Sequence, residues 1–270
     1  MTDREQLPPP AASPDRQSEA YKVLTGTAWG MRTGRRILSS LPASPRCKLC
    51  GSPFRGPISP LMRAIGKGPW PKNPKYCSWC FKEMITRRDG AEIECSLLFA
   101  DVRGSTSLAE TMSPGEFNAA MSRFFDAASR VLFDHDAFVD KYVGDEVIGI
   151  FIPALAGELH ARRAVAAGVA MLKATGHDRG DPWVPIGVGV NRGTAYVGAV
   201  GVGENLEFTA MGDAVNVTAR LASAAGAGEV LVSAAAAAAA QLETGSREHR
   251  QLALKGKSEA TEVIVLRAEG

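Results

Sequence analysis

The sequence lacks a run of 18 consecutive apolar residues, so we expect no membrane-spanning helix. It also lacks an excess of charge of one sign, because 31 Lys and Arg face 29 Asp and Glu. A net charge of +2 predicts no basic footprint for nucleic acid. The Pro-rich, polar N-terminus has no apolar segment of the kind found in secretory signals. These absences predict a cytoplasmic protein without a nucleic-acid partner.

Histidine and cysteine are also scarce. The four His residues have no spacing typical of metal ligands, and we expect them at the surface. The five Cys residues belong to a chain that we expect in a reducing compartment, where paired cysteines bind metal more often than they form disulfides.

Four of the cysteines form two Cys-x-x-Cys pairs, which are separated by 26 residues rich in Pro and Gly. They are Cys47, Cys50, Cys77 and Cys80. Two such pairs suit tetrahedral coordination of one Zn²⁺ with no open position, which predicts a structural site in a small zinc-ribbon-like module at 45–88. An iron–sulfur cluster or a redox pair remains an alternative. Cys95 lies in an apolar run and is expected in the core.

Two segments precede this module. Residues 1–18 are polar and Pro-rich, which predicts a disordered tail. Residues 19–44 mix Arg with apolar residues and Gly, which predicts a linker or a short helix. The alternative for this segment is a basic amphipathic helix that touches a membrane or a regulatory partner.

From residue 91 onward, apolar runs of strand length alternate with helical patterns. The first run, 93–100, predicts a buried strand that ends at Asp101. Ser113-Pro-Gly-Glu116 is a capping box with Pro at the first helical position. Two later apolar runs flank Gly144-Asp145, which is typical of a hairpin. A strand-end carboxylate beside a hairpin-turn carboxylate suits two hard metal ions.

The remaining pattern predicts an α+β fold. We expect a helix at 159–174, strands at 183–190 and 194–200, a helix at 212–225, a strand at 229–232, a helix at 234–240 and a closing strand pair around 255–257. The order strand–helix–strand–strand–helix–strand predicts a ferredoxin-like palm (βαββαβ).

Four motifs in this order resemble the class III nucleotidyl cyclase catalytic domain. They are Phe-Ala-Asp-Val-Arg-Gly-Ser-Thr at 99–106, Lys-Tyr-Val-Gly-Asp-Glu at 141–146, Phe-Thr-Ala-Met-Gly-Asp-Ala-Val-Asn-Val-Thr-Ala-Arg-Leu at 208–221 and Leu-Lys-Gly-Lys at 254–257. The resemblance covers residues 91–270, and the N-terminal third lies outside it. Ser105 departs from the pattern, since many members have Phe there.

The resemblance implies that the ribose 3′-oxygen of a nucleoside triphosphate attacks the α-phosphorus and that pyrophosphate leaves. By the same resemblance, Asp101 and Asp145 bind two Mg²⁺ or Mn²⁺ ions. Asn216 and Arg220 match the residues that orient the ribose and stabilise the transition-state phosphate. Lys255 matches a residue that binds the triphosphate.

Two further matches bear on the base. Lys141 matches the position whose ammonium donates to adenine N1, where guanine has an N1–H donor. Thr209 stands where many adenylate cyclases have Asp and is similar to the class IIIb subgroup; its hydroxyl can accept from the adenine 6-amino group. A hydroxyl can also donate, so Thr selects less firmly than Asp. The resemblance implies an adenylate cyclase that acts on ATP in signal transduction.

In this family two subunits share each active site, so a single catalytic domain predicts a homodimer. Guanylate cyclase activity and a catalytically inactive nucleotide-binding regulatory module remain alternatives. Val143-Gly-Asp-Glu146 also resembles the diguanylate cyclase signature, but neither that class nor polymerase-like palms require the motif that holds Asn216 and Arg220.

Overall fold

A computed structural model of the protein describes residues 18–28, 38, 44–71, 73–86, 90–201, 207–253 and 260–268. The expected tail at 1–18, except Ser18, lies outside the described residues. The same holds for most of the Arg-rich part of 19–44, and for Lys255.

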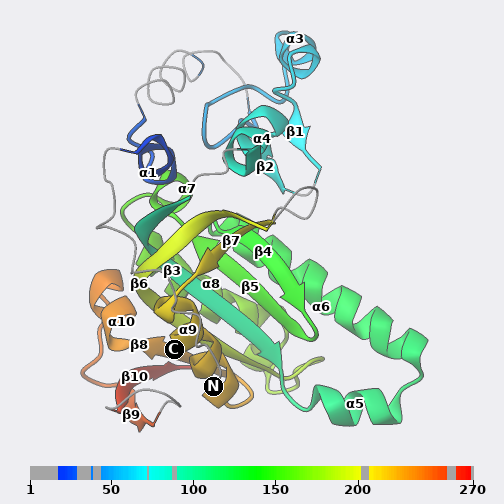
Figure 1. Ribbon diagram of the computed structural model, residues 1–270. Helices are drawn as coiled ribbons and strands as arrows, with labels where there is room; N and C mark the ends of the chain where they lie inside the picture. The colour runs from blue at the N-terminus through cyan, green and yellow to red at the C-terminus, as the bar shows by residue number, and fades with distance from the viewer. Residues whose placement is uncertain are drawn as a thin grey trace, which may run out of the picture.

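A mixed eight-stranded sheet forms the centre of the chain from residue 91 onward (Figure 1). Its order is β4 (Phe138–Val143), β5 (Glu146–Phe151), β3 (Ala91–Val102), β6 (Ile186–Val200), β8 (Glu229–Ser233), β10 (Thr261–Leu266) and β9 (Glu248–Leu252), while β7 (Glu207–Met211) pairs with β6. β6 and β8 run parallel, and the other pairs are antiparallel. The order β4-β5-β3-β6, with the long helix α6 (Pro114–Asp134) in the connection from β3 to β4 and α8 (His160–Ala174) in the connection from β5 to β6, confirms the ferredoxin-like palm.

Helices cover both faces of this sheet. One face packs against α6 (Pro114–Asp134), α8 (His160–Ala174) and α10 (Ala234–Ala240) around a core that includes Leu98, Phe124 and Met171. The other face carries α9 (Asp213–Ala224) and α1 (Glu19–Leu24), which contact β3. Successive side chains of a strand point to opposite faces, so Leu98 faces α6 while Leu97 and Phe99 face α9.

Local sequence chemistry explains the main boundaries. The capping box at α6 is confirmed: Ser113 Oγ accepts from Glu116 N at 3.3 Å, and the Glu116 carboxylate accepts from Ser113 N at 2.9 Å. Gly144 takes φ +61° in the β4–β5 turn, a conformation that Gly adopts without strain. At Gly189 a Cβ would lie 2.4 Å from Ala222 N, so only Gly lets α9 approach β6 this closely.

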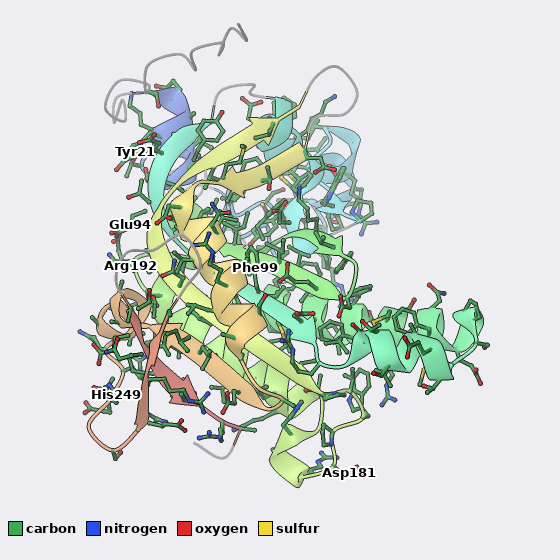
Figure 2. All side chains as sticks on the ribbon, turned by 60° about the horizontal axis from the view of Figure 1, so that its bottom comes forward. Tyr21, Glu94, Phe99, Asp181, Arg192 and His249 are labelled. Atoms are coloured by element: carbon green, nitrogen blue, oxygen red, sulfur yellow. The ribbon has the colours of Figure 1, made fainter. Side chains whose placement is uncertain are left out.

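Two expectations were wrong. The strands expected at 183–190 and 194–200 form one strand, β6, which pairs continuously with β3. The residues between the two expected strands have partners on other elements: Asn191 Nδ2 donates to Ala214 O at 3.1 Å, and Arg192 forms an ion pair with Glu94 of β3 (Figure 2). His160 is buried rather than exposed, because its Nδ1 hydrogen-bonds Ser96 Oγ at 2.9 Å.

The structure adds short elements that the hydrophobic pattern did not predict. They are β7, α5 (Ser105–Thr111), α7 (Pro153–Ala156) and the 3-10 turn η1 (His177–Arg179). Around the cysteine pairs lie α3 (Ser59–Ala64), β1 (Pro69–Trp70), β2 (Asn73–Cys77) and α4 (Ser78–Thr86). Within the described ranges, no helix combines the length and apolarity that crossing a bilayer requires.

Candidate active site

Asp101 and Asp145 lie together at one end of the β3–β5 ladder. Asp101 is the penultimate residue of β3 and pairs with Glu146 across the sheet. Asp145 sits in the hairpin turn, and its carbonyl oxygen accepts from Val102 N at 3.3 Å. Strand alternation puts Asp101 on the α9 face of β3. The structure therefore brings together the two carboxylates that the sequence singled out.

These carboxylates share a strongly acidic environment. Burial raises the pKa of Asp101 to about 6, an effect that the Arg103 guanidinium opposes and the Asp145 carboxylate reinforces. Burial also raises the pKa of Glu146 to about 7, with help from the charges of Asp101 and Asp145. A bound cation stabilises the ionised forms of carboxylates that repel one another, and carboxylate oxygens are suitable ligands for Mg²⁺ or Mn²⁺. The donor set thus fits the divalent ions expected here.

Arg103 is a further member of this site. It forms an ion pair with Asp101, and its Nη1 donates to Ser223 O at the end of α9 at 3.1 Å. Arg103 and Glu146 lie within the motifs at 99–106 and 141–146, but their spacing alone indicates no role for them.

Lys141 lies on β4 and Thr209 lies on β7. The side chain of each residue forms a hydrogen bond with the other strand. Lys141 Nζ donates to Glu207 Oε2 at 2.7 Å, and Thr209 Oγ1 donates to Asp140 Oδ2 at 2.7 Å. Thr209 is buried and Lys141 is partly exposed. Glu207 and Asp140 were not predicted, because each depends on how β4 and β7 lie beside one another.

Asn216 and Arg220 lie four residues apart on α9 and share a face of that helix. Asn216 is exposed and Arg220 is half-buried. Within the described residues neither side chain has a hydrogen bond or ion pair, so nothing in one chain links them to Asp101 or Lys141. Lys255 lies outside the described residues.

The four predicted cysteines form one cluster. All four Sγ atoms lie within 4.8 Å of one another, and Cys50 Sγ is 3.8 Å from Cys77 Sγ. Two backbone amides also point at sulfur: Cys77 N donates to Cys47 Sγ at 3.2 Å, and Cys80 N to Cys77 Sγ at 3.4 Å. None of the four forms a disulfide. As expected, Cys95 is separate and buried in β3.

We call the part of the chain that carries Cys47, Cys50, Cys77 and Cys80 the cysteine segment. A row of aromatic rings connects it to the strands that carry Lys141 and Thr209. Trp70 stacks on Phe81 of α4 with ring centroids 4.6 Å apart, and Phe81 stacks on Phe138 of β4 at 5.8 Å. Phe138 then meets Phe208 of β7 edge to face at 5.0 Å. Phe208 is adjacent to Thr209, so the cysteine segment packs directly behind these strands.

A family model described as the adenylate and guanylate cyclase catalytic domain matches residues 90–267. Among curated proteins, adenylate cyclase 1 of Rhizobium meliloti is 34% identical over 134 residues, which are 47% of this chain and 20% of that protein. The adenylate cyclase of Anabaena cylindrica is 31% identical over 137 residues, covering 47% of this chain and 26% of that protein. The chain thus spans about a quarter or less of the length of these relatives.

Solved structures with a similar fold include two cyclases. The guanylyl cyclase Cya2 aligns with a TM-score of 0.61 and 26% identity, covering 65% of this chain and 92% of that one. The adenylyl cyclase CyaB from P. aeruginosa aligns with a TM-score of 0.58 and 27% identity, covering 66% of this chain and 96% of that one.

Proposed function

The chain belongs to the adenylate and guanylate cyclase catalytic domain family, and from this premise we propose that it is an adenylate cyclase. It would convert ATP to 3′,5′-cyclic AMP and pyrophosphate, in the service of signal transduction. The observation that carries the choice of ATP is the proximity of Lys141 and Thr209 on β4 and β7, each bonded to a residue of the other strand.

These two residues suit adenine. The Lys141 ammonium has only donors, and adenine N1 is an acceptor, whereas guanine N1–H would face it donor to donor. The Thr209 oxygen can accept from the adenine 6-amino group. A site that leaves a buried donor or acceptor unpaired rejects the wrong base strongly, so two such contacts suffice for a clear preference.

Asp101 and Asp145 would hold two Mg²⁺ or Mn²⁺ ions, with Glu146 as a neighbouring carboxylate. When bound, such ions lower the pKa of a coordinated hydroxyl and neutralise charge on phosphate oxygens. Arg103 competes with a cation for Asp101, since it forms an ion pair with that carboxylate.

The phosphate and ribose would be positioned by α9 and the C-terminal loop. Asn216 orients the ribose, and the fixed fork of donors on Arg220 stabilises the charge that develops on the α-phosphate. Lys255 binds the triphosphate. Asn216 and Arg220 project from one helix face without partners in the described part of their own chain, which suits a site completed by a second subunit.

We propose that the protein acts as a homodimer with two equivalent sites. Each site would take Asp101 and Asp145 from one subunit, and Lys141, Thr209, Asn216 and Arg220 from the other. A two-fold axis makes both sites identical, because the same surface serves each subunit in turn.

The cysteine cluster would hold one structural Zn²⁺. Four thiolates at about 2.3 Å from one ion in a tetrahedron lie about 3.8 Å apart, close to the 3.8 Å between Cys50 and Cys77. An iron–sulfur cluster spreads its ligands further than the 4.8 Å that encloses all four sulfurs. None of the five cysteines forms a disulfide, which agrees with a reducing, cytoplasmic location.

Guanylate cyclase activity is the second candidate, because the Glu207 carboxylate lies beside Lys141 and could accept from guanine N1–H. Purified protein incubated with Mn²⁺ and either ATP or GTP separates the two candidates, with Asp101→Ala as the inactive control. Cyclic AMP as the main product supports the proposal, and cyclic GMP as the main product overturns the choice of ATP. No cyclic product with any divalent ion would support an inactive binding module.

A further inference from the structure

The hydrogen bond between Thr209 and Asp140 has a defined direction. Thr209 Oγ1 lies 2.7 Å from Asp140 Oδ2, and a hydroxyl beside an ionised carboxylate can only donate to it. Burial raises the pKa of Asp140 above its usual value, while the hydrogen bond from Thr209 and the charge of Lys141 limit that rise. The hydroxyl proton of Thr209 therefore points to the Asp140 carboxylate on β4.

The second oxygen of Asp140 is a further reason for the Thr209 hydroxyl to keep this orientation. Asp140 Oδ1 is buried and has no hydrogen-bond partner in the described part of the chain. If the Thr209 hydroxyl turned its proton elsewhere, the Asp140 carboxylate would keep no hydrogen bond among the described residues. Leaving a buried charged group without a donor is costly, so the hydroxyl stays in this orientation when a ligand arrives.

We propose that Asp140 is a specificity-determining positioning residue, which makes Thr209 an acceptor only toward the base. The inference rests on the proposed function, in which Thr209 faces the 6-position of the purine. With its proton held by Asp140, Thr209 can accept from the 6-amino group of adenine. It has no proton for O6 of guanine or hypoxanthine, so two acceptors would meet there.

In this arrangement Thr209 resembles a carboxylate, because it can only accept a hydrogen bond from the base. A free hydroxyl would serve adenine and guanine alike, because it can rotate to donate or to accept. The neighbouring pair Lys141–Glu207 and the edge-to-face contact of Phe138 with Phe208 join the same two strands, and so they keep Asp140 opposite Thr209. Selectivity at the 6-position therefore depends on two strands rather than on one side chain.

The test compares ATP with inosine triphosphate, which carries O6 and N1–H but no 2-amino group. Steady-state kcat/KM for both is measured for wild type, Asp140→Asn, Thr209→Val and the double variant. The Asp140→Asn amide can donate to Thr209 as well as accept from it, so the hydroxyl is free to turn toward O6. We expect Asp140→Asn to reduce the ATP preference about tenfold, the size of one hydrogen-bond mismatch.

The double variant separates a positioning role from a structural one. If Asp140 acts through the Thr209 hydroxyl, Asp140→Asn changes the substrate ratio by less than about twofold when Thr209 is already Val. An equal change in both backgrounds overturns the inference, as does an unchanged ratio in Asp140→Asn. Should Asp140→Asn fail to fold, Thr209→Ser and Thr209→Val decide: retention of the ATP preference by Ser alone supports the inference, and equal preferences overturn it.

The outcome for wild type distinguishes this inference from the function on which it rests. Wild-type protein that shows no preference for ATP over inosine triphosphate and GTP overturns the proposed function and this inference together. Wild-type preference for ATP that survives in Asp140→Asn overturns the inference alone.

Discussion

Lys48, which stands between two cysteines of the cluster, forms an ion pair with the buried Asp136 at the corner between α6 and β4. The Asp136 side chain is only 6% exposed and also pairs with Arg163 of α8. A second lysine of the cysteine segment, Lys75, donates to Asp134 at 2.9 Å. The cysteine segment is therefore fixed to the corner from which β4 leads to Lys141 and Asp145.

Replacing Lys48 tests this docking. Lys48→Met keeps most of the apolar stem but removes the charge beside a buried carboxylate. We expect a loss of about 1–2 kcal/mol in the free energy of unfolding, less than for a fully unpaired buried charge, because Arg163 remains. Urea unfolding measures this change.

The matched control is Arg130→Met, which breaks the ion pair with Asp126 on the exposed side of α6. Both partners are largely exposed, and such pairs contribute about 0–0.5 kcal/mol. Equal small losses in Lys48→Met and Arg130→Met would show that the corner contact does not hold the cysteine segment in place.

Removal of the proposed zinc should affect the substrate site. Cys50→Ser eliminates one of four ligands, so we expect the protein to lose its one Zn²⁺ per chain and to melt at a lower temperature. The ring row from Trp70 to Phe208 ends beside Thr209. We therefore expect KM for ATP to rise several-fold, with a smaller change in kcat. Elemental analysis, thermal melting and steady-state kinetics measure the three effects.

Cys95→Ala is the control for this variant, because Cys95 is a buried thiol outside the cluster. It should keep the metal and the wild-type KM, although a small core cavity lowers stability. A zinc-free Cys50→Ser protein with wild-type KM would mean that the cysteine segment does not support the substrate strands.

Much of the fold could be predicted because its signals are local. The Ser113 capping box and the Gly144 turn depend on residues close in sequence, and both are present. The single long strand β6 could not be predicted, since Asn191 and Gly193 are typical of a turn. They stay in the strand because Asn191 bonds α9 and because Gly193 admits Ala214, whose Cβ would lie 3.0 Å from an added Cβ.

The residues of the candidate site also divide into those with a local sequence signal and those that depend on long-range contacts. Asp101 and Asp145 were identifiable from strand-end and turn positions, and the structure places them together. Asp140 and Glu207 gave no signal, because their partners lie 69 and 66 residues away on strands that do not share a backbone ladder. Such contacts depend on tertiary register, which periodicity does not encode.

We expect Glu229 to make the free energy of unfolding depend on pH in the acidic range. Hydrogen bonds from Arg250 are the main reason that its pKa falls to about 2, and this pair ties β8 to the edge strand β9 that leads toward Lys255. A lowered folded-state pKa adds stability that is present above the ordinary value of 4.5 and disappears as pH falls toward about 2. Glu229→Gln should therefore lose about 1–2 kcal/mol at neutral pH and show a flatter stability profile between these limits.

Urea unfolding across this pH range checks the prediction, with Glu262→Gln as control. Glu262 lies on β10, is about half exposed and pairs only with His249 among the described residues. Its replacement should change stability by less than about 0.5 kcal/mol. A Glu229→Gln profile as steep as that of wild type would show that Glu229 does not contribute to the acid transition.

The shared-site dimer gives a prediction about mixtures. Asp101→Ala homodimers lack a metal ligand in both sites, and Arg220→Ala homodimers lack the phosphate donor in both sites, so each protein alone should be nearly inactive. In a mixed dimer both lesions fall in one site, and the other site is intact. Random exchange makes half of the dimers mixed with one working site each, so the mixture should reach about a quarter of wild-type activity.

A second mixture tests the same model through a loss of activity rather than a recovery. When both lesions are placed in one chain and that chain is mixed with an equal amount of wild type, every mixed dimer has one lesion in each site. Only wild-type homodimers then work, which is about a quarter of all dimers. If each subunit carried its own complete site, half of the activity would remain. Activity near one half here, together with no recovery in the first mixture although mixed dimers form, would mean that Asp101 and Arg220 serve the same site within one chain.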